Sequence, residues 1–384
     1  MTSTERPLPF TIDVPQAVLV DLRERLGRAR WPGEVPGSGW EYGSNLQYMR
    51  SLVEYWLTAY DWRVHERELN RFRHYRASVD GLGLHFIHER GAGPDPLPLL
   101  ILHGWPGSIY EFSAVIPRLT DPARFGGDAR DAFDVIVPSL PGYGFSDPTR
   151  ERGVNIQRMA DLFVRLMDLL GYPRFLAQGG DWGAVICSYL GYAHPARLLG
   201  IHLNMLGVAP HPEDRANLSP AEQAFLKQAQ EWQRDGAGYQ WIQGTRPQTL
   251  AYALNDSPVG LAAWLVEKFR AWTDCDGEVE RRLGKDQLLT LITIYWVTQT
   301  INASMRLYYE VRRYPWRLKK GERIRVPTGI AAFPKEIFRP PREWAERVYN
   351  VTRWTVMPAG GHFAALEEPE ALVDEIRAFA REFR

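Results

Sequence analysis

The sequence is poor in cysteine and has no excess of charge of either sign. Its two cysteines, Cys187 and Cys275, fit neither a disulfide framework nor the spacing of a metal site. The 46 basic and 46 acidic residues give a formal net charge of zero, and no long block of like charges occurs. This balance points to no nucleic-acid partner and to no anionic membrane surface. We expect a reduced, cytoplasmic setting.

Long apolar runs are also missing. No stretch approaches the roughly 18 consecutive apolar residues of a membrane-spanning helix. The first residues, MTSTERPLPFTIDVP, lack the charged and then apolar regions of a signal peptide. We therefore expect a soluble protein with no membrane anchor.

What the sequence does contain is an alternation of short apolar runs with helical patterns. HYRASVDGLGLHFIHERG, residues 74–91, predicts a hairpin that turns at Asp80–Gly81. Further strand-length runs are PLLILHG, FDVIVPSLPG, RFLAQGG, LLGIHLNMLG, RVPTGIAAF and VTRWTVMPAGGH. IQRMADLFVRLMDLLG is one of the helical patterns between them. Buried strands that alternate with helices predict a mostly parallel sheet flanked by helices.

Changes in this pattern divide the chain into four parts. Residues 1–75 look helical, and residues 76–210 carry the first part of the α/β alternation. In residues 211–310 the alternation stops and polar, aromatic-rich helical patterns take over, before residues 311–384 resume it. The simplest interpretation is an α/β core interrupted by a helical cap and preceded by a helical meander.

GGDWGA, residues 179–184, is the first chemical motif. In strand–turn–helix context, G-x-X-x-G is typical of the nucleophile elbow of α/β-hydrolases, where X is usually serine. Here the central residue is Asp181. The start of the following helix would favour its ionised form. An aspartate that caps a helix would give the same local pattern, so the motif needs partners elsewhere in the chain.

A histidine and an acid follow in the order that this fold requires. Of the nine histidines, only His362 lies between the last predicted strand and the last helix and follows a glycine pair. Glu336 comes just after RVPTGIAAF and is the candidate for the acid that orients His362. Glu367 and Glu368 are nearby alternatives, but they follow His362 and are better placed to open the final helix.

HGWPGS, residues 103–108, follows the strand PLLILHG. In an α/β-hydrolase this loop donates one oxyanion-hole N–H, and the residue after the nucleophile donates the other. The two donors would be the backbone N–H groups of Trp105 and Trp182. An ordinary Pro-Gly turn is the structural alternative for this loop.

A carboxylate at the nucleophile position favours a particular chemistry. Aspartate, with an ordinary pKa of about 3.9, is already ionised at neutral pH. It is a poor nucleophile for amides and esters, but it can displace a leaving group from saturated carbon and form an alkyl ester. Water activated by His362 would then hydrolyse that ester. A halide and an epoxide oxygen are both suitable leaving groups, and the epoxide oxygen needs a proton donor such as tyrosine.

Several longer stretches are specific in combination. They are HGWPGS, SLPGYGFSDP, GGDWGA, ALNDSPVGLAAWLVEKF, SMRLYYE, VPTGIAAFPKE and GGHFAALEEPE. Through them nearly the full chain resembles the microsomal-type epoxide hydrolases, which include the insect juvenile-hormone epoxide hydrolases. The resemblance implies an α/β-hydrolase fold with an inserted helical cap and an N-terminal helical meander. Membrane-bound members begin with an apolar anchor, so this chain looks like a soluble, bacterial-type member.

The resemblance also assigns roles to residues. It implies that Asp181 is the nucleophile, His362 the general base and Glu336 the acid that orients it. It places the two cap tyrosines of the family at Tyr239, in GAGYQWIQ, and at Tyr308, in SMRLYYE. Neighbouring Tyr309 is easily confused with Tyr308, which is preferred because it lies two residues after the arginine of SMRLYYE.

The function implied is hydrolysis of a hydrophobic epoxide to a vicinal diol, with water as co-substrate and no metal or organic cofactor. Two alternatives stay open: a haloalkane or haloacid dehalogenase, and a non-catalytic hydrolase-fold binding protein. A homodimer is an open alternative to a monomer.

Overall fold

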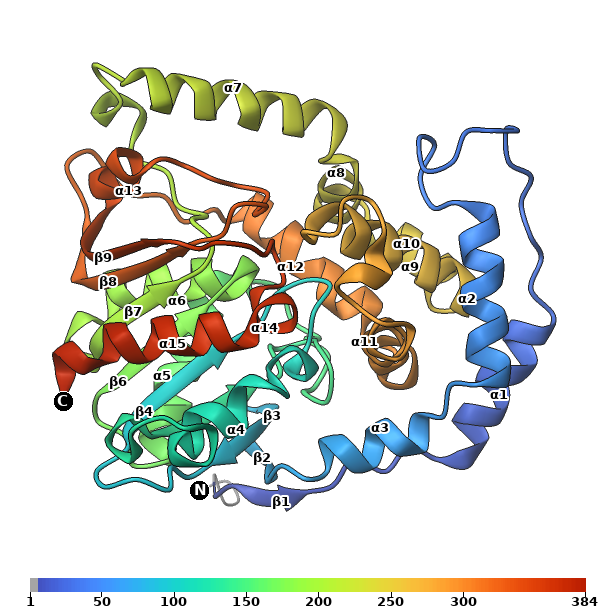
Figure 1. Ribbon diagram of the computed structural model, residues 1–384, viewed down its shortest axis with the longest axis horizontal. Helices are drawn as coiled ribbons and strands as arrows, with labels where there is room; N and C mark the ends of the chain where they lie inside the picture. The colour runs from blue at the N-terminus through green and yellow to red at the C-terminus, as the bar shows by residue number, and fades with distance from the viewer. Residues whose placement is uncertain (1–5) are drawn as a thin grey trace.

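A nine-stranded sheet forms the centre of the molecule in the computed structural model, which describes residues 6–384 (Figure 1). Its strands run in the order β1-β2-β3-β5-β4-β6-β7-β8-β9. Their bounds are β1 (Leu8–Phe10), β2 (His74–Val79), β3 (Leu82–Glu89), β4 (Leu97–Leu102), β5 (Phe133–Pro138), β6 (Phe175–Gly179), β7 (Leu198–Leu203), β8 (Ile324–Ala332) and β9 (Tyr349–Val356). The predicted hairpin and the six later strands are confirmed.

The sheet is antiparallel at one edge and parallel elsewhere. β1, β2, β3 and β5 pair antiparallel, whereas the pairs from β5 through β4, β6, β7 and β8 to β9 are parallel. Every residue of β5 and β6 is buried. A parallel strand that is covered on both faces must be apolar throughout, which explains the continuous runs in the sequence.

Helices cover both faces of the sheet (Figure 1). α4 (Val115–Thr120) and α15 (Pro369–Ala380) pack together on one face, and α5 (Ile156–Leu169) and α6 (Asp181–Ala193) pack on the other. α13 (Arg342–Val348) packs on β9, and α14 (Ala364–Glu367) precedes α15. Because the strands from β5 to β9 are parallel, their carboxyl ends all lie at one rim of the sheet, where the loops after β4, β6, β8 and β9 meet.

Six helices lie between β7 and β8 in the chain and form the cap. They are α7 (Pro220–Asp235), α8 (Gly238–Thr245), α9 (Pro247–Leu254), α10 (Pro258–Trp272), α11 (Lys285–Thr298) and α12 (Ile301–Arg313). In Figure 1, α8 to α12 gather beside the sheet, while α7 lies across the top. Nine consecutive residues of α11 are buried, so this helix is the interior of the cap.

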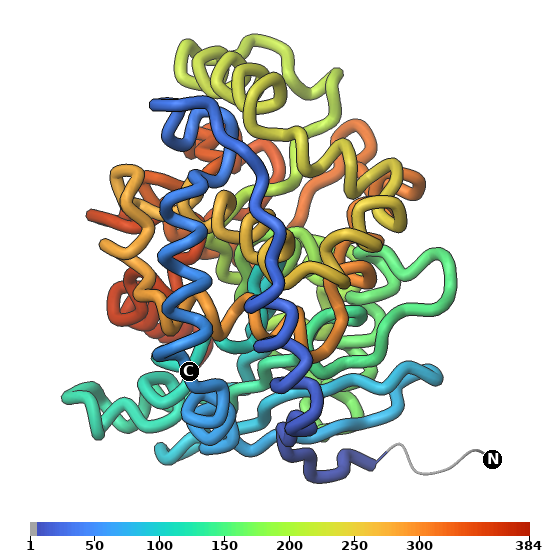
Figure 2. The backbone as a smooth tube through the Cα atoms, turned by 90° about the vertical axis from the view of Figure 1, so that its right-hand side faces the viewer, coloured from blue at the N-terminus to red at the C-terminus, as the bar shows by residue number. Residues whose placement is uncertain are grey.

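The N-terminal region links the edge of the sheet to the cap. α1 (Gln16–Gly27) and α2 (Leu46–Thr58) both contact α10, and α3 (Trp62–Leu69) contacts α11 (Figure 2). The prediction that residues 1–75 are helical is wrong at Leu8–Phe10, which pair with β2 as an edge strand because an exposed strand edge offers unpaired backbone groups. β2 also begins at His74, inside the expected helical region, and residues 1–5 lie outside the described residues.

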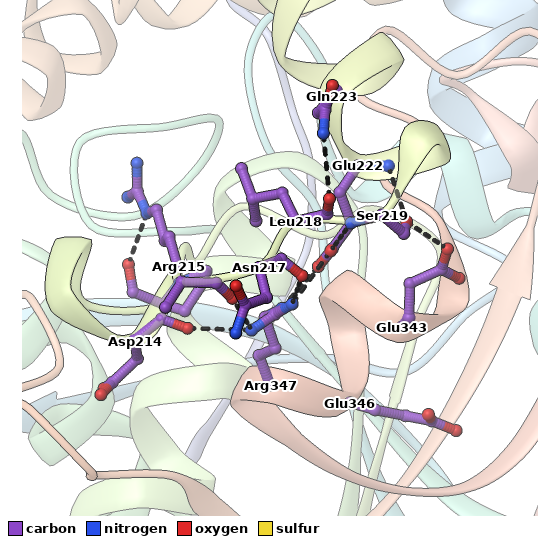
Figure 3. Close-up of polar contacts among 12 residues, drawn as sticks. Asp214, Arg215, Asn217, Leu218, Ser219, Glu222, Gln223, Glu343, Glu346 and Arg347 are labelled. Atoms are coloured by element: carbon purple, nitrogen blue, oxygen red, sulfur yellow. Dashed lines mark hydrogen bonds and ion pairs between the residues drawn. The ribbon is translucent and has the colours of Figure 1, made fainter.

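A buried ion pair fixes the segment that leads into the cap (Figure 3). Arg347 of α13 donates to both carboxylate oxygens of Glu222 in α7, at 2.5 and 3.0 Å. It also donates to the backbone oxygen of Asp214 at 3.0 Å. Ser219, the N-cap of α7, donates to Glu343 at 2.8 Å. Since Glu222 is fully buried, its charge depends on Arg347, and loss of the arginine would leave an uncompensated buried carboxylate.

Candidate active site

Asp181 lies on a sharp turn between β6 and α6. Its φ is +47°, a left-handed backbone conformation that non-glycine residues seldom adopt. Two glycines leave room for the turn: a Cβ on Gly183 would lie 2.1 Å from the backbone oxygen of Leu102, and one on Gly104 would lie 2.0 Å from Oδ1 of Asp181. The close packing holds the strained residue at the rim of the sheet, as expected for a nucleophile elbow.

His362 lies between two carboxylates. Its Nε2 is 3.2 Å from Oδ2 of Asp181, and its Nδ1 is 2.7 Å from Oε1 of Glu336. The imidazole is buried, as is Glu336, whereas 16% of the Asp181 side chain is exposed. The loops after β6, β8 and β9 thus bring together three residues that are far apart in the sequence.

The two carboxylates control the charge of His362. Burial alone lowers the pKa of this imidazole, but Glu336 and Asp181 outweigh it and raise the pKa well above the ordinary value. The two carboxylates thus favour the protonated form of the ring. If Asp181 became neutral, one of the two anions would be lost and the pKa would fall.

The nearby acids have different partners. Glu367 accepts hydrogen bonds from the backbone N–H groups of Asp274, Gly361 and Phe363, at 2.7 to 3.0 Å. Glu368 pairs with Arg282 at 2.7 Å. Glu336 is thus the carboxylate that meets His362 on Nδ1, while Glu367 fixes the loop that carries His362.

The loop after β4 supplies a backbone hydrogen-bond donor to Asp181. The N–H of Trp105 donates to Oδ1 of Asp181 at 2.8 Å. His103 holds this loop, because its Nε2 accepts from the Leu140 N–H at 3.1 Å and its Nδ1 lies 3.0 Å from the Gly104 oxygen. Burial lowers the pKa of His103 to about 4, so its ring is neutral. Trp182 lies in the first turn of α6, where backbone N–H groups have no intrahelical acceptor.

Aromatic rings from the cap pack against Trp105 and Trp182. Tyr239 of α8 stacks on Trp105, with ring centres 5.3 Å apart. Tyr308 of α12 meets Trp182 edge to face at 4.8 Å, and the two tyrosines are 5.8 Å apart. Burial, together with the charge of Asp181, raises the pKa of both tyrosines well above the ordinary value. Both phenols are therefore protonated and can act as hydrogen-bond donors.

Tyr309 occupies a different environment from Tyr308. Its ring lies under the Arg313 guanidinium, with 4.9 Å from the carbon of that group to the ring centre. The structure thus places Tyr308, and not its neighbour, in the aromatic cluster.

Two further ionisable side chains in this region were not predicted from the sequence. Glu111, in the 3₁₀ turn η1 (Ile109–Phe112), has a carboxyl group buried near Asp181 and His362. Lys268 of α10 is buried among aromatic rings, with its ammonium 4.8 Å from the ring centre of Tyr239 and 5.9 Å from those of Trp264 and Trp272. The only signal for Glu111 was the Ser-x-x-Glu pattern of a helix start, which is structural.

Residues 6–384 contain neither a candidate metal-binding cluster nor a candidate membrane-spanning helix. No group of three or more His, Cys, Asp or Glu side chains in this range could hold a metal ion. In the same range, no helix has the length and apolarity needed to cross a membrane.

Comparison with known proteins relates the whole chain to one group. Residues 7–112 match the family model described as the epoxide hydrolase N terminus, and residues 98–243 match the alpha/beta hydrolase fold. A Stigmatella aurantiaca protein assigned by name to the epoxide hydrolases is 48% identical over 98% of this chain and 85% of its own length. Epoxide hydrolase 1 of Sus scrofa is 38% identical over 97% of this chain and 88% of its own length.

A solved structure agrees with this relationship. The crystal structure of juvenile hormone epoxide hydrolase from the silkworm Bombyx mori superposes with a TM-score of 0.91 at 33% identity, over 99% of this chain and 95% of that one. The similarity therefore includes the N-terminal region and the cap as well as the sheet.

Proposed function

Because the chain belongs to the epoxide hydrolase family and has the α/β-hydrolase fold, we propose that it converts a hydrophobic epoxide to a vicinal diol through a covalent ester on Asp181. One observation carries the mechanism. A strained carboxylate lies 2.8 Å from a backbone donor and 3.2 Å from an imidazole that a second carboxylate orients. This arrangement combines a nucleophile, a base and an oxyanion donor at one point.

Ring opening comes first. Tyr239 and Tyr308 donate hydrogen bonds to the epoxide oxygen while Asp181 attacks a ring carbon from the opposite side. The C–O bond of the ring breaks, and its electron pair takes a proton from a tyrosine to become a hydroxyl group. The product is a hydroxyalkyl ester of Asp181.

Ester hydrolysis follows. Esterification neutralises Asp181, so the pKa of His362 falls and the imidazole gives up its proton, which returns through solvent to the tyrosine. The neutral ring then takes a proton from water as the water oxygen attacks the ester carbon. The backbone N–H groups of Trp105 and Trp182 stabilise the tetrahedral oxyanion, at about 3 to 4 kcal/mol for each well-placed donor. The diol leaves with a proton from His362, and the acid formed at Asp181 then gives its proton to His362, which restores the carboxylate.

The cap favours an epoxide over a haloalkane. An epoxide oxygen leaves as an alkoxide, which needs a proton, whereas a halide leaves without one. Two buried, protonated phenols over a carboxylate supply that proton. The aromatic rings around them suit an apolar substituent.

Mass spectrometry of the His362→Gln variant tests the proposal. Incubated with styrene oxide, the variant should carry an adduct of epoxide mass on the peptide that contains Asp181, because alkylation continues while hydrolysis stops. Asp181→Asn is the matched control and should carry none. A wild-type enzyme that releases halide from chloroalkanes but forms no diol from any epoxide would show that the proposal is wrong.

A further inference from the structure

A small cavity lies against Asp181 and His362. Its volume is about 20 Å³, and its lining includes Gly107, Glu111, Asp181 and His362. Neither Tyr239 nor Tyr308 is part of this lining. A space of roughly 10 to 15 Å³ is enough for one water molecule when polar groups surround it. The cavity therefore has the size and the polar lining for a single water beside the imidazole.

Glu111 is the one carboxyl group lining this cavity for which the proposed cycle has no role. It is 9% exposed, and the Ser108 N–H donates to its Oε1 at 3.1 Å. A Cβ on Gly107 would lie only 1.5 Å from the same oxygen, so the carboxyl group is packed directly on the oxyanion loop. Within residues 6–384, no Lys, Arg or His side chain forms an ion pair with it.

This carboxyl group is neutral at neutral pH. Burial raises the pKa of Glu111 to about 8, and the negative charge of Asp181 acts in the same direction, against the opposing effects of His362 and the Ser108 N–H. The other titratable groups close to it are the phenol of Tyr295, which donates to the Gly107 oxygen at 2.9 Å, and the neutral ring of His103, which lines the same cavity. A protonated carboxyl can donate one hydrogen bond and accept others.

We propose that Glu111 is a positioning residue that holds the hydrolytic water in this cavity, between its own carboxyl group and Nε2 of His362. The inference rests on the proposed function and adds to it a site for the second substrate. The carboxyl O–H donates to one lone pair of the water, and the water donates one hydrogen to His362. Its second lone pair then faces the ester carbon of Asp181.

The chemical step needs nothing beyond these groups. The water oxygen forms a bond to the ester carbon, and the proton of the water passes to Nε2 of His362. The bond between that carbon and the alkoxy oxygen then breaks, and the alkoxide takes the proton from His362. The carboxylic acid left at Asp181 passes the second proton of the water to His362, which restores the starting pair. Glu111 keeps its own proton throughout, so it acts only by placing the water.

Separate measurement of the two half-reactions tests the proposal. In single-turnover experiments with styrene oxide, Trp105 and Trp182 beside the ester provide a fluorescence signal for ester formation and decay. Glu111→Met should leave alkylation within about three-fold and slow ester decay about 100-fold, the scale of a misplaced reactant. The alkyl-enzyme should then accumulate on the Asp181 peptide with His362 intact. Glu111→Gln, which keeps a donor and an acceptor, should restore decay to within about five-fold.

Further variants separate this role from a structural one. Gly107→Ala keeps Glu111 but displaces its carboxyl group, so it should slow ester decay more than alkylation. Glu375→Gln removes another buried carboxylate, which pairs at 2.7 Å with Arg353 of β9, and should change neither step. In wild type the rate of ester decay should change across about pH 8, where Glu111 ionises, and Glu111→Gln should remove that transition.

The outcomes distinguish the two proposals. Equal slowing of both steps in Glu111→Met, or equal damage in Glu111→Gln and Glu111→Met, would overturn the water-holding role and leave the covalent mechanism intact. Should wild type and His362→Gln form no adduct with any epoxide, both proposals fall. If Glu111→Met does not fold, the Gly107→Ala result and the wild-type pH profile decide the question.

Discussion

On the sheet side of Asp181 the site is built from charged and hydrogen-bonding groups, and on the cap side it is built from aromatic rings. His362 and Glu336 lie within 2.7 Å of each other on the sheet side, with Glu111 beside them. Tyr239 and Tyr308 come from the cap, with ring centres 5.8 Å apart, and Tyr308 meets Trp182 of α6 edge to face. The reactive carboxylate lies between two surfaces of opposite character.

This difference suggests that each of the two surfaces serves one of the two half-reactions. Ring opening develops negative charge on an oxygen attached to an apolar substrate, which suits protonated phenols in an aromatic setting. Ester hydrolysis moves a proton from water, which suits a paired imidazole and a hydrogen-bonded cavity. Substitutions on the cap side should therefore alter alkylation, and substitutions on the sheet side should alter hydrolysis.

Removal of both cap phenols should have the largest effect. In Tyr239→Phe/Tyr308→Phe, alkylation should fall about 10³-fold, within the range of general acid catalysis. Decay of ester that has already formed should change less than three-fold. Stopped-flow fluorescence with styrene oxide measures both rates, and Tyr309→Phe is the matched control, since that ring lies beside Arg313. A double variant in which only ester decay slowed would contradict the assignment of ring opening to the cap side.

On the sheet side, Glu336→Gln should act on the other half-reaction. Loss of the carboxylate at 2.7 Å removes the charge that keeps His362 basic and correctly oriented. Ester decay should fall about 100-fold, and the alkyl-enzyme should persist long enough for detection by mass spectrometry. In Glu368→Gln, which removes the contact with Arg282, the ester should decay at the wild-type rate. Equal losses in both steps would mean that the sheet side also controls ring opening.

The buried acid on the sheet side should also make folding stability depend on pH. The pKa of Glu111 is raised from 4.5 to about 8, so between these values the unfolded chain is ionised there while the folded chain keeps its proton. The free energy of unfolding of the wild type should therefore fall by about 1.4 kcal/mol per pH unit through Glu111 as the pH rises from 5 to 8. Above pH 8 this effect should level off. Glu111→Gln cannot titrate, so denaturant unfolding should show its stability rising relative to wild type over this range. A constant difference would mean that Glu111 is not neutral at pH 7.

The smallest expected effect concerns Lys268 on the cap side. Its ammonium lies 4.8 Å from the ring centre of Tyr239, where a positive charge stabilises electron density that builds up on the phenol oxygen. Lys268→Met should slow alkylation about five- to ten-fold, the equivalent of roughly 1 kcal/mol for a buried cation–π contact. Lys268→Arg should recover most of the rate, while ester decay stays unchanged in both. Equal rates in the Met and Arg variants would assign the lysine a packing role alone.

The site residues that the sequence predicts are those whose chemistry and order along the chain agree. A turn motif indicates Asp181, the position after the last strand indicates His362, and the two side chains lie 3.2 Å apart. Glu336 was selected by its place after a strand, and the alternatives Glu367 and Glu368 bond elsewhere. Asp181, Glu336 and His362 each lie in the segment that follows a parallel strand, so the topology of the sheet brings them to one rim.

Glu111 and Lys268 could not be found in the same way. Both lie within helical turns, where a charged residue normally faces solvent. Glu111 is instead folded back onto Ser108, and Lys268 is enclosed by rings from α8 and α10. Their positions depend on how the oxyanion loop and the cap pack, which no local pattern encodes. The edge strand Leu8–Phe10 was missed for a related reason, since its partner is β2, more than sixty residues later.

The N-terminal link between the sheet and the cap affects how the protein is made. α1 buries Leu19, Leu22 and Leu26, and it contacts α10, which begins at Pro258. A ribosome therefore releases this apolar face more than two hundred residues before the cap surface that it packs against. Throughout that interval the nascent chain must either keep the face from associating with other chains or rely on a chaperone to cover it.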